Sequence, residues 1–200
     1  MAPAPFVIKP FSGESFLYDI YARLLEERIV FLFGPIDDEL SDSVVAQLLY
    51  LDALGDKKDV YMYINSPGGS ITSGMAILDT MRAISCEITT VCIGQAASMG
   101  AILMLGGTKG KRISLPNSRF LIHQPLGGAI GTSTDIEIQT AEIVRMKEIL
   151  NRMISEETGQ PYDKVVKDTD RDNFMSAQEA KKYGLIDKIV QQLPGRNGKK

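Results

Sequence analysis

Short apolar runs alternate with amphipathic stretches along this chain from residue 16 onward. Four of the apolar runs are rich in β-branched or aromatic residues and end near Gly, Pro or Asn, which is typical of strands. These runs cover residues 28–33, 59–65, 89–94 and 119–123. Because strand-like and helix-like periods alternate, the pattern predicts an α/β domain rather than an all-helical or all-strand one.

Helical patterns occupy the intervals between these runs. Residues 38–54 and 70–84 place apolar side chains three or four positions apart, so each predicts a helix with one apolar stripe. The longest helical pattern follows Gly131 and continues to about Thr158. A helix of this length is unusual in a compact domain, and glycines border its start. We therefore expect residues from about 124 to 158 to project as a contact arm.

Capping residues mark two of the predicted helices. Residues 132–135, Thr-Ser-Thr-Asp, offer several N-caps for the long helix. Ser176 and Glu179 have the spacing of a capping box, and Gly184 follows at the position of a C-terminal cap. A short helix is therefore predicted between Ser176 and Gly184.

The length of 200 residues predicts one compact domain, over residues 19–193. Residues 1–15 contain prolines and a glycine, which makes them poor candidates for regular structure. We expect residues 1–18 to form a mobile N-terminal segment and residues 194–200 a flexible basic tail.

The composition argues against several classes of function. The formal net charge is −3, and the two small basic clusters do not resemble a nucleic-acid face. Cys86 and Cys92 lack metal-ligand spacing, and the one histidine cannot complete a site with them, so we expect neither a metal nor a disulfide framework. No segment approaches the roughly twenty apolar residues that cross a bilayer, so we expect no membrane anchoring, no export and a cytoplasmic location.

A single histidine, His123, follows Ser98 along the chain. In a serine enzyme with an imidazole base, His123 would have to lie beside that serine, because imidazole exchanges protons near neutral pH. A lone histidine after an apolar run is also typical of a hydrogen-bonded core residue. The neighbouring motifs decide between the two readings.

Two strand-like runs lead directly into turns that precede helices, at Asn65–Gly69 and Gly94–Ser98. Glycines let the backbone approach a ligand closely, and a helix N-terminus adds unpaired N–H donors and a partial positive charge. The N–H groups of Gly69 and Met99 are therefore candidate oxyanion donors. Either motif alone is compatible with an ordinary turn or a helix cap, and their repetition favours the oxyanion site.

A triad also needs a carboxylate to orient the imidazole. Asp168, Asp170 and Asp172 are all candidates, and spacing does not choose among them. The order Ser, His, Asp differs from the orders of the α/β-hydrolases, chymotrypsin and subtilisin, and Gly94–Ser98 does not fit the Gly-x-Ser-x-Gly elbow. These three families are disfavoured.

Five segments resemble those of the ClpP family, the proteolytic subunits of ATP-dependent Clp proteases. They are residues 63–69, 94–101, 115–119, 122–128 and 171–172. The resemblance extends from about Asp19 to Val190, and the segments follow the family's order. It implies a ClpP/crotonase fold of repeated strand-strand-helix units with a projecting helix arm. It also implies a serine endopeptidase that degrades unfolded polypeptides to short peptides.

The same resemblance implies the roles of individual residues. Ser98 would be the nucleophile, His123 the general base and Asp172 the orienting acid. The N–H groups of Gly69 and Met99 would take the oxyanion role. The choice of Asp172 over the other two aspartates comes from the family alone, and no cofactor is implied.

The resemblance further implies an assembly of two stacked heptameric rings that enclose a chamber. The arm would lie between the rings, with Asp170 and Arg171 at an inter-ring contact. Because such a chamber would keep folded proteins out, a hexameric Clp AAA+ ATPase would unfold and thread substrates. The chain itself would bind no nucleotide, which agrees with its lack of a Gly-x-x-x-x-Gly-Lys-Ser/Thr loop. Tyr61 and Tyr63 share one strand face, which resembles the pocket that receives ATPase loops. A homo-oligomer and assembly with paralogous subunits both stay open, as does an organelle stroma in place of the cytoplasm.

Two rival functions have other requirements. A crotonase-type acyl-CoA enzyme also polarises a carbonyl with two backbone N–H groups, but it does not need a serine and a histidine at these positions. A non-catalytic ring subunit would be expected to lack triad residues, and here all three types are present. Replacement of Ser98 by alanine separates the classes, because a thioester enzyme that relies on backbone donors would keep much of its activity.

Overall fold

Three parallel strands form the centre of the main sheet in the computed structural model, which describes residues 6–11, 14–56 and 58–193. They are β3 (Ile29–Phe33), β4 (Val60–Ser66) and β5 (Ile88–Ala97), in that spatial order. Their β-branched and aromatic residues favour the extended backbone. All three were predicted from the sequence, and the structure confirms them.

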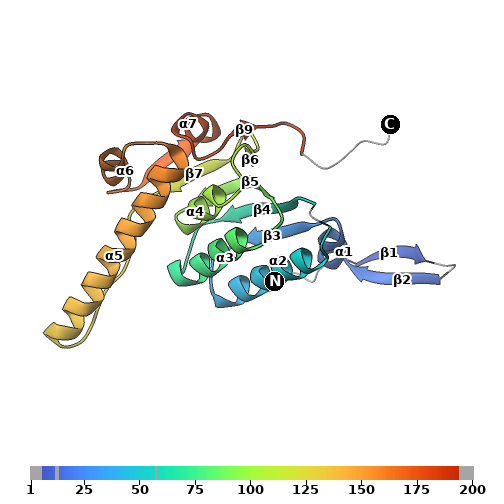
Figure 1. Cartoon of the computed structure of the whole chain (residues 1–200), viewed down its shortest axis with the longest axis horizontal. Coiled ribbons are helices and arrows are strands. Elements are labelled where there is room, and N and C mark those ends of the chain that lie inside the picture. Colours follow the sequence, from blue (N-terminus) through green and yellow to red (C-terminus); the bar gives the residue numbers. More distant parts are fainter. Residues whose placement is uncertain (1–5, 12–13, 57, 194–200) are drawn as a thin grey trace.

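Helices connect these strands and cover one face of the sheet (Figure 1). Helix α2 (Asp38–Ala53) leads from β3 to β4, and α3 (Ile71–Ala83) leads from β4 to β5. The two helices pack against each other, and α4 (Met99–Leu105) follows β5 directly. The helices predicted at 38–54 and 70–84 are thus confirmed.

Strand β5 divides the sheet into two branches. Its residues Thr90–Cys92 pair in parallel with β6, and Gln95–Ala97 pair in parallel with β7. Between them Gly94 has φ of +82°, which favours glycine. The β6 branch continues to β9 in parallel, whereas β7 pairs with β8 antiparallel. The bounds are β6 Arg112–Ser114, β7 Arg119–Ile122, β8 Asn173–Ser176 and β9 Lys188–Ile189.

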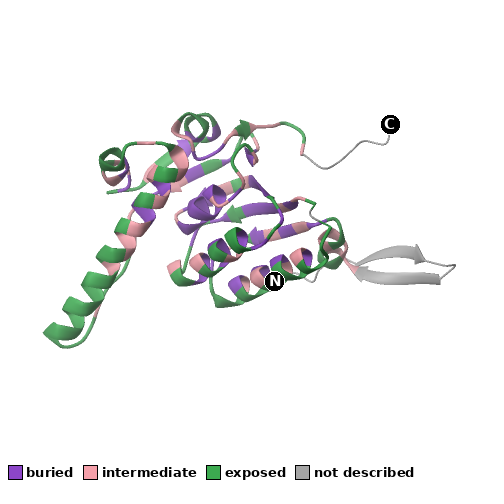
Figure 2. Cartoon of the chain, in the orientation of Figure 1, coloured by how far each residue is buried: buried purple, intermediate pink, exposed green. Residues whose placement is uncertain are grey.

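Buried apolar side chains lie on both faces of the sheet, because successive strand residues point to opposite sides. The larger cluster lies between the sheet and the helices and includes Leu32, Leu48, Met62, Ile77 and Leu103. A smaller cluster on the opposite face contains Tyr63, Val91 and Ile113. Figure 2 shows that burial concentrates around β3–β5 and α4 and is sparse along the long helix.

The long helix, α5 (Ser133–Thr158), projects from the body, as Figure 1 shows. Thr132 is its N-cap and forms a capping box with Asp135, which confirms one of the capping candidates. Its buried residues, Leu150, Asn151 and Ile154, belong to the half that lies against the body. The expected arm is therefore present, with its tip formed by the start of α5 and the segment that precedes it.

Two further helices follow the arm, α6 (Tyr162–Asp168) and α7 (Ala177–Tyr183). The capping box of Ser176 and Glu179 and the left-handed cap at Gly184 are both present, so the predicted short helix is confirmed. The sequence patterns did not predict α6, nor the short strands β6, β8 and β9, which lack a full period of alternation.

The N-terminal prediction needs a correction. Residues Phe6–Phe11 (β1) and Glu14–Asp19 (β2) form an antiparallel hairpin that leads into α1 (Ile20–Glu26). The expectation that residues 1–15 lack regular structure is therefore wrong for this part. Proline is tolerated in edge strands, and both strands of a two-stranded hairpin are edges. Residues 1–5 and 12–13 and the predicted flexible tail at 194–200 lie outside the described residues.

Candidate active site

His123 and Asp172 meet because β7 and β8 pair antiparallel. Ile122, at the end of β7, lies opposite Asn173, at the start of β8. One further step of this register sets His123 opposite Asp172. The imidazole Nδ1 lies 2.9 Å from the carboxylate Oδ1, so the neutral ring carries its proton on Nδ1 and donates it to the carboxylate.

Ser98 reaches the same point from the neighbouring strand. It follows the last residue of β5, and its N–H donates to the carbonyl of Leu121 in β7 at 2.8 Å. The Ser98 Oγ lies 2.8 Å from Nε2 of His123. With the ring proton on Nδ1, Nε2 accepts the Ser98 O–H. The histidine therefore joins a hydroxyl to a carboxylate and is not an isolated core residue.

The backbone at Ser98 is strained. Its φ of 54° and ψ of −123° lie in a backbone region that residues other than glycine rarely adopt. Although Ser98 stands at the N-cap of α4, its side chain makes no capping hydrogen bond. The interpretation of Ser98 as an ordinary cap is thus wrong, because its hydroxyl points to the imidazole instead.

The first glycine turn packs directly on this serine. A Cβ on Gly68 would lie 2.6 Å from Ser98 Cβ and 2.8 Å from the carbonyl oxygen of Ala97, so only glycine fits. The Gly68 carbonyl accepts from Ile36 N–H, and the Ile36 carbonyl accepts from Ser70 N–H. These two hydrogen bonds form a short parallel bridge between Ile36 and Gly69, and the Gly69 N–H takes part in neither of them.

The second candidate donor is the N–H of Met99, the first residue of α4. The first N–H groups of a helix have no partner within it. Met99 is buried, and a Cβ on Gly74 would lie 2.3 Å from its Cγ, so the side chain anchors the start of α4 against α3. The two predicted oxyanion donors therefore lie on adjoining turns.

Beside the triad is a cavity of about 230 Å³. Its lining includes Gly69, Ser98, Met99 and His123. The rest of the lining is mainly apolar and comes from Pro67, Ile71, Ile102, Ile122, Pro125, Leu126, Leu150 and Ile154. A group bound there would contact apolar side chains while its reacting atom lay near Ser98.

Spacing left Asp168 and Asp170 as alternatives to Asp172, which is the one beside the imidazole, and Asp168 has other partners. Asp168 accepts hydrogen bonds from Lys164 Nζ at 2.5 Å and from the Tyr183 hydroxyl at 2.9 Å. Burial, together with this carboxylate, raises the pKa of the Tyr183 hydroxyl. Asp168 therefore belongs to a contact between α6 and α7, away from the imidazole.

Gln124, directly after the histidine, fastens the loop that carries the acid. Its N–H donates to the carbonyl of Thr169 at 2.6 Å, and its side-chain amide donates to the carbonyl of Asp170 at 2.7 Å. Its amide oxygen accepts from Lys147 Nζ at 2.8 Å. The sequence motifs did not predict this role, although the position of Gln124 beside His123 was a signal. In the same loop, the Arg171 guanidinium is exposed and lies 3.9 Å from the Asp170 carboxylate.

The two cysteines are not competing nucleophiles. Both are free and buried. Burial raises the pKa of the Cys86 thiol and raises that of Cys92 to about 12, so neither is a thiolate near neutral pH. No group of three or more His, Cys, Asp or Glu side chains within the described ranges could hold a metal ion.

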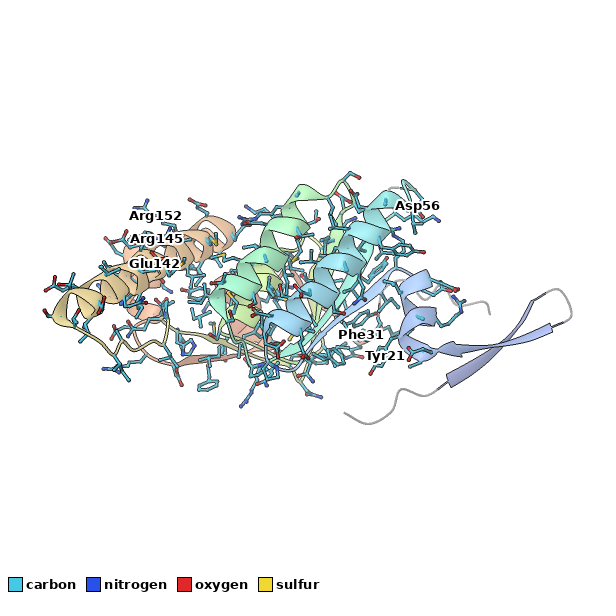
Figure 3. All side chains as sticks on the ribbon, turned by 90° about the horizontal axis from the view of Figure 1, so that it is seen from below. Tyr21, Phe31, Asp56, Glu142, Arg145 and Arg152 are labelled. Carbon is cyan, nitrogen blue, oxygen red and sulfur yellow. The ribbon has the colours of Figure 1, made fainter. Side chains whose placement is uncertain are left out.

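Tyr61 and Tyr63 lie on the sheet face opposite the helices. Their shared face was predicted, and the small cluster around Tyr63 confirms it. Tyr63 is buried and Tyr61 half-buried. Phe31 lies 5.8 Å from Tyr63 and 5.6 Å from Tyr21 between ring centroids, and Figure 3 shows Tyr21 beside Phe31.

A comparison with protein-family models identifies the chain. The model described as Clp protease matches residues 12–193. The match and the mixed α/β architecture confirm the predicted ClpP/crotonase fold. In the part of the chain that the structure describes, no helix has the length and apolar character needed to cross a membrane. The chain belongs to the Clp protease family and is a hydrolase, a peptidase of the ClpP type.

Proposed function

We propose that this chain is a serine endopeptidase in which Ser98 is the nucleophile, His123 the general base and Asp172 the orienting acid. The observation that carries the proposal is the position of one imidazole between a hydroxyl and a carboxylate, at 2.8 Å and 2.9 Å. Both distances are within hydrogen-bond reach, and each ring nitrogen has one partner.

The reaction follows from this arrangement. Ser98 Oγ attacks the peptide carbonyl carbon while its proton moves to Nε2 of His123. The N–H groups of Gly69 and Met99 stabilise the oxyanion that forms. The imidazolium then gives its proton to the leaving amine, which leaves an acyl-serine. Water, deprotonated by His123, releases the acyl group and restores Ser98.

The substrate is an unfolded polypeptide with an apolar residue before the scissile bond. The cavity beside Ser98 is lined mainly by apolar side chains, which supports this preference. A buried apolar side chain would contribute roughly 1.5–3 kcal/mol to binding.

The arm supports the proposal of two stacked heptameric rings. Leu126, Ile130 and Ile138 are 83%, 103% and 61% exposed, although each is a large apolar side chain. A second copy that covers these residues would bury their apolar surface. We place Asp170 and Arg171, which follow the arm's base, at the contact between rings.

A hexameric Clp AAA+ ATPase would feed unfolded chains into the chamber enclosed by the rings. The aromatic face that contains Tyr61 and Tyr63 is the proposed docking surface for its loops. Aromatic residues are favoured at such contacts because they supply large, rigid surface.

The test compares wild type with Ser98→Ala on a short fluorogenic peptide and on an acyl-CoA thioester. The proposal predicts peptide turnover that the variant loses by a factor of about a thousand or more, and no thioester turnover. Thioester turnover that survives in Ser98→Ala would instead support a crotonase-type enzyme. Correct assembly of the variant is checked by sedimentation.

A further inference from the structure

A second serine, Ser66, lies buried behind the candidate oxyanion site. It is the last residue of β4 and is 0% exposed. It is not part of the triad, and in strand pairing it lies opposite Ala96, two positions before Ser98. A hydroxyl in such a buried position is retained only where it forms hydrogen bonds.

The Ser66 hydroxyl joins two loops. It donates to the carbonyl of Gly34 at 2.7 Å and accepts from the N–H of Gly68 at 3.1 Å. Gly34 is itself fixed, since its N–H donates to the carbonyl of Asn65 at 2.9 Å. Ser66 therefore ties the turn that carries Gly69 to the rigid end of the sheet.

Ser66 also contacts the segment that carries the other donor. A Cβ on Gly100 would lie 3.2 Å from the Ser66 carbonyl oxygen and 3.3 Å from the Ser66 Cβ. Gly100 follows Met99 in the first turn of α4. Ser66 thus bonds the turn that presents the Gly69 N–H and packs closely beside the turn that presents the Met99 N–H.

We propose that Ser66 is a positioning residue that holds the Gly69 and Met99 N–H groups at the spacing that an oxyanion requires. This inference rests on the proposed serine peptidase function. Without the hydroxyl, the buried Gly68 N–H and the half-buried Gly34 carbonyl lose their partner, and the turn can rotate toward new ones. A misplacement of about 1 Å in such a site lowers the rate by up to about a hundredfold.

The experiment measures kcat and KM for Ser66→Ala on a matched peptide oxoester and thionoester. Rates are divided by the number of Ser98 sites that a fluorophosphonate titrates, so unfolded protein does not count. A thiocarbonyl sulfur is a weak hydrogen-bond acceptor and gains less from the N–H donors than oxygen does. The ratio of oxoester to thionoester rates therefore reports on the oxyanion site rather than on stability.

We expect kcat for the oxoester to fall about ten- to a hundredfold in Ser66→Ala, with KM within about twofold and the oxoester-to-thionoester ratio reduced by a similar factor. Ser66→Cys, which keeps a weak donor and acceptor and a similar volume, should lie in between. The matched control is Ser41→Ala, because Ser41 is also buried and donates to a backbone carbonyl, that of Ser73, at 2.9 Å. Its kcat and ratio should not change.

An unchanged kcat in Ser66→Ala, or a lower kcat with an unchanged ratio, would overturn the inference and leave the peptidase proposal intact. A wild-type protein without Ser98 labelling or turnover would instead overturn the proposed function. The two failures are therefore distinguishable.

Discussion

The corner where β4, β5 and β7 end differs from the arm in how far its side chains find hydrogen-bond and packing partners within one chain. At the corner, Ser98, His123 and Asp172 are hydrogen-bonded in series, and glycine turns pack backbone against backbone. Along the first half of α5 most residues are exposed, and several are large and apolar. The corner is complete within one chain, whereas the arm has apolar surface that another molecule would cover.

The proposed chemistry and the proposed assembly therefore lie on separate elements. The triad depends on the register of three strands, which a contact at the arm tip does not set. The base of the arm is the link between the two regions, since Lys147 of α5 bonds Gln124 beside His123. Variants at the corner should therefore affect the rate per site, and variants at the arm tip should affect association.

The largest effect is expected for Asp172→Asn. An amide NH2 that donates to Nδ1 places the ring proton of His123 on Nε2. In this tautomer Nε2 cannot accept the Ser98 proton, and kcat should fall about ten-thousandfold. Peptide hydrolysis measures this loss. The control is Asp168→Asn, whose carboxylate bonds Lys164 and Tyr183 instead. Equal losses in both variants would refute the assignment of Asp172 as the orienting acid.

Gly68→Ala should lower kcat about a hundredfold or more, because its Cβ would lie 2.6 Å from Ser98 Cβ and displace the turn. Gly110→Ala is the matched control. Gly110 has a similar φ, +86° against +93°, but nothing lies within 4 Å of the added Cβ. Backbone strain alone would affect both variants alike, so a comparable activity in the two would contradict close packing at the corner.

Asp187→Asn tests the anchor of the arm's base. Arg112 is buried, bonds Asp187 at 2.6 Å and donates to the carbonyl of Glu157 near the end of α5 at 3.2 Å. Loss of one partner of such a pair costs about 3 kcal/mol, measurable by urea unfolding at pH 7. Glu142→Gln, in the exposed pair with Arg145 on the arm (Figure 3), should cause no measurable change.

The pH dependence of the Asp187 effect has a definite sign. Burial raises the pKa of the carboxyl, but its bonds to Arg112 and to Gly110 N–H outweigh burial, and the pKa lies below its usual range. The stabilisation is therefore present above the ordinary value of about 4 and is lost as pH falls through the lower folded-state value. Wild type and Asp187→Asn should converge in stability in acid. A difference that stays constant to low pH would be inconsistent with this ion pair.

The smallest effect is expected for Ile138→Ser at the arm. This side chain is 61% exposed, so the folded chain loses little, but ring pairing should weaken about tenfold because less apolar surface is buried between copies. Sedimentation over a concentration series measures the shift, and Ile138→Leu is the control that keeps the apolar volume. Unchanged assembly in Ile138→Ser would contradict the proposal that the arm tip forms the contact between rings.

Much of the fold was predictable because its central elements carry full periods of alternation. The hydrophobic period can be recognised in the longer elements, which are the strands β3, β4 and β5 and the helices α2, α3 and α5. The short strands β6, β8 and β9 do not show it, since pairing partners distant in sequence define them. The hairpin β1–β2 pairs locally, but its prolines and the glycine that follows argued against regular structure there.

The site was predictable in part. The glycine turns and the single histidine indicated Ser98, Gly69, Met99 and His123. The proposed acid could not be chosen from spacing, because it is the antiparallel register of β7 and β8 that brings Asp172 to His123. Ser66 carried no sequence signal for its contacts, which arise only when three loops meet in space.

Activation of Ser98 by His123 is tested by mass spectrometry of the protein after reaction with a fluorophosphonate, for wild type, His123→Ala and urea-unfolded chain. We expect a single adduct on Ser98 in folded wild type, formed at least about a hundredfold more slowly in His123→Ala and absent from the unfolded chain. An adduct on another serine, or equal labelling of Ser98 with and without His123, would contradict it.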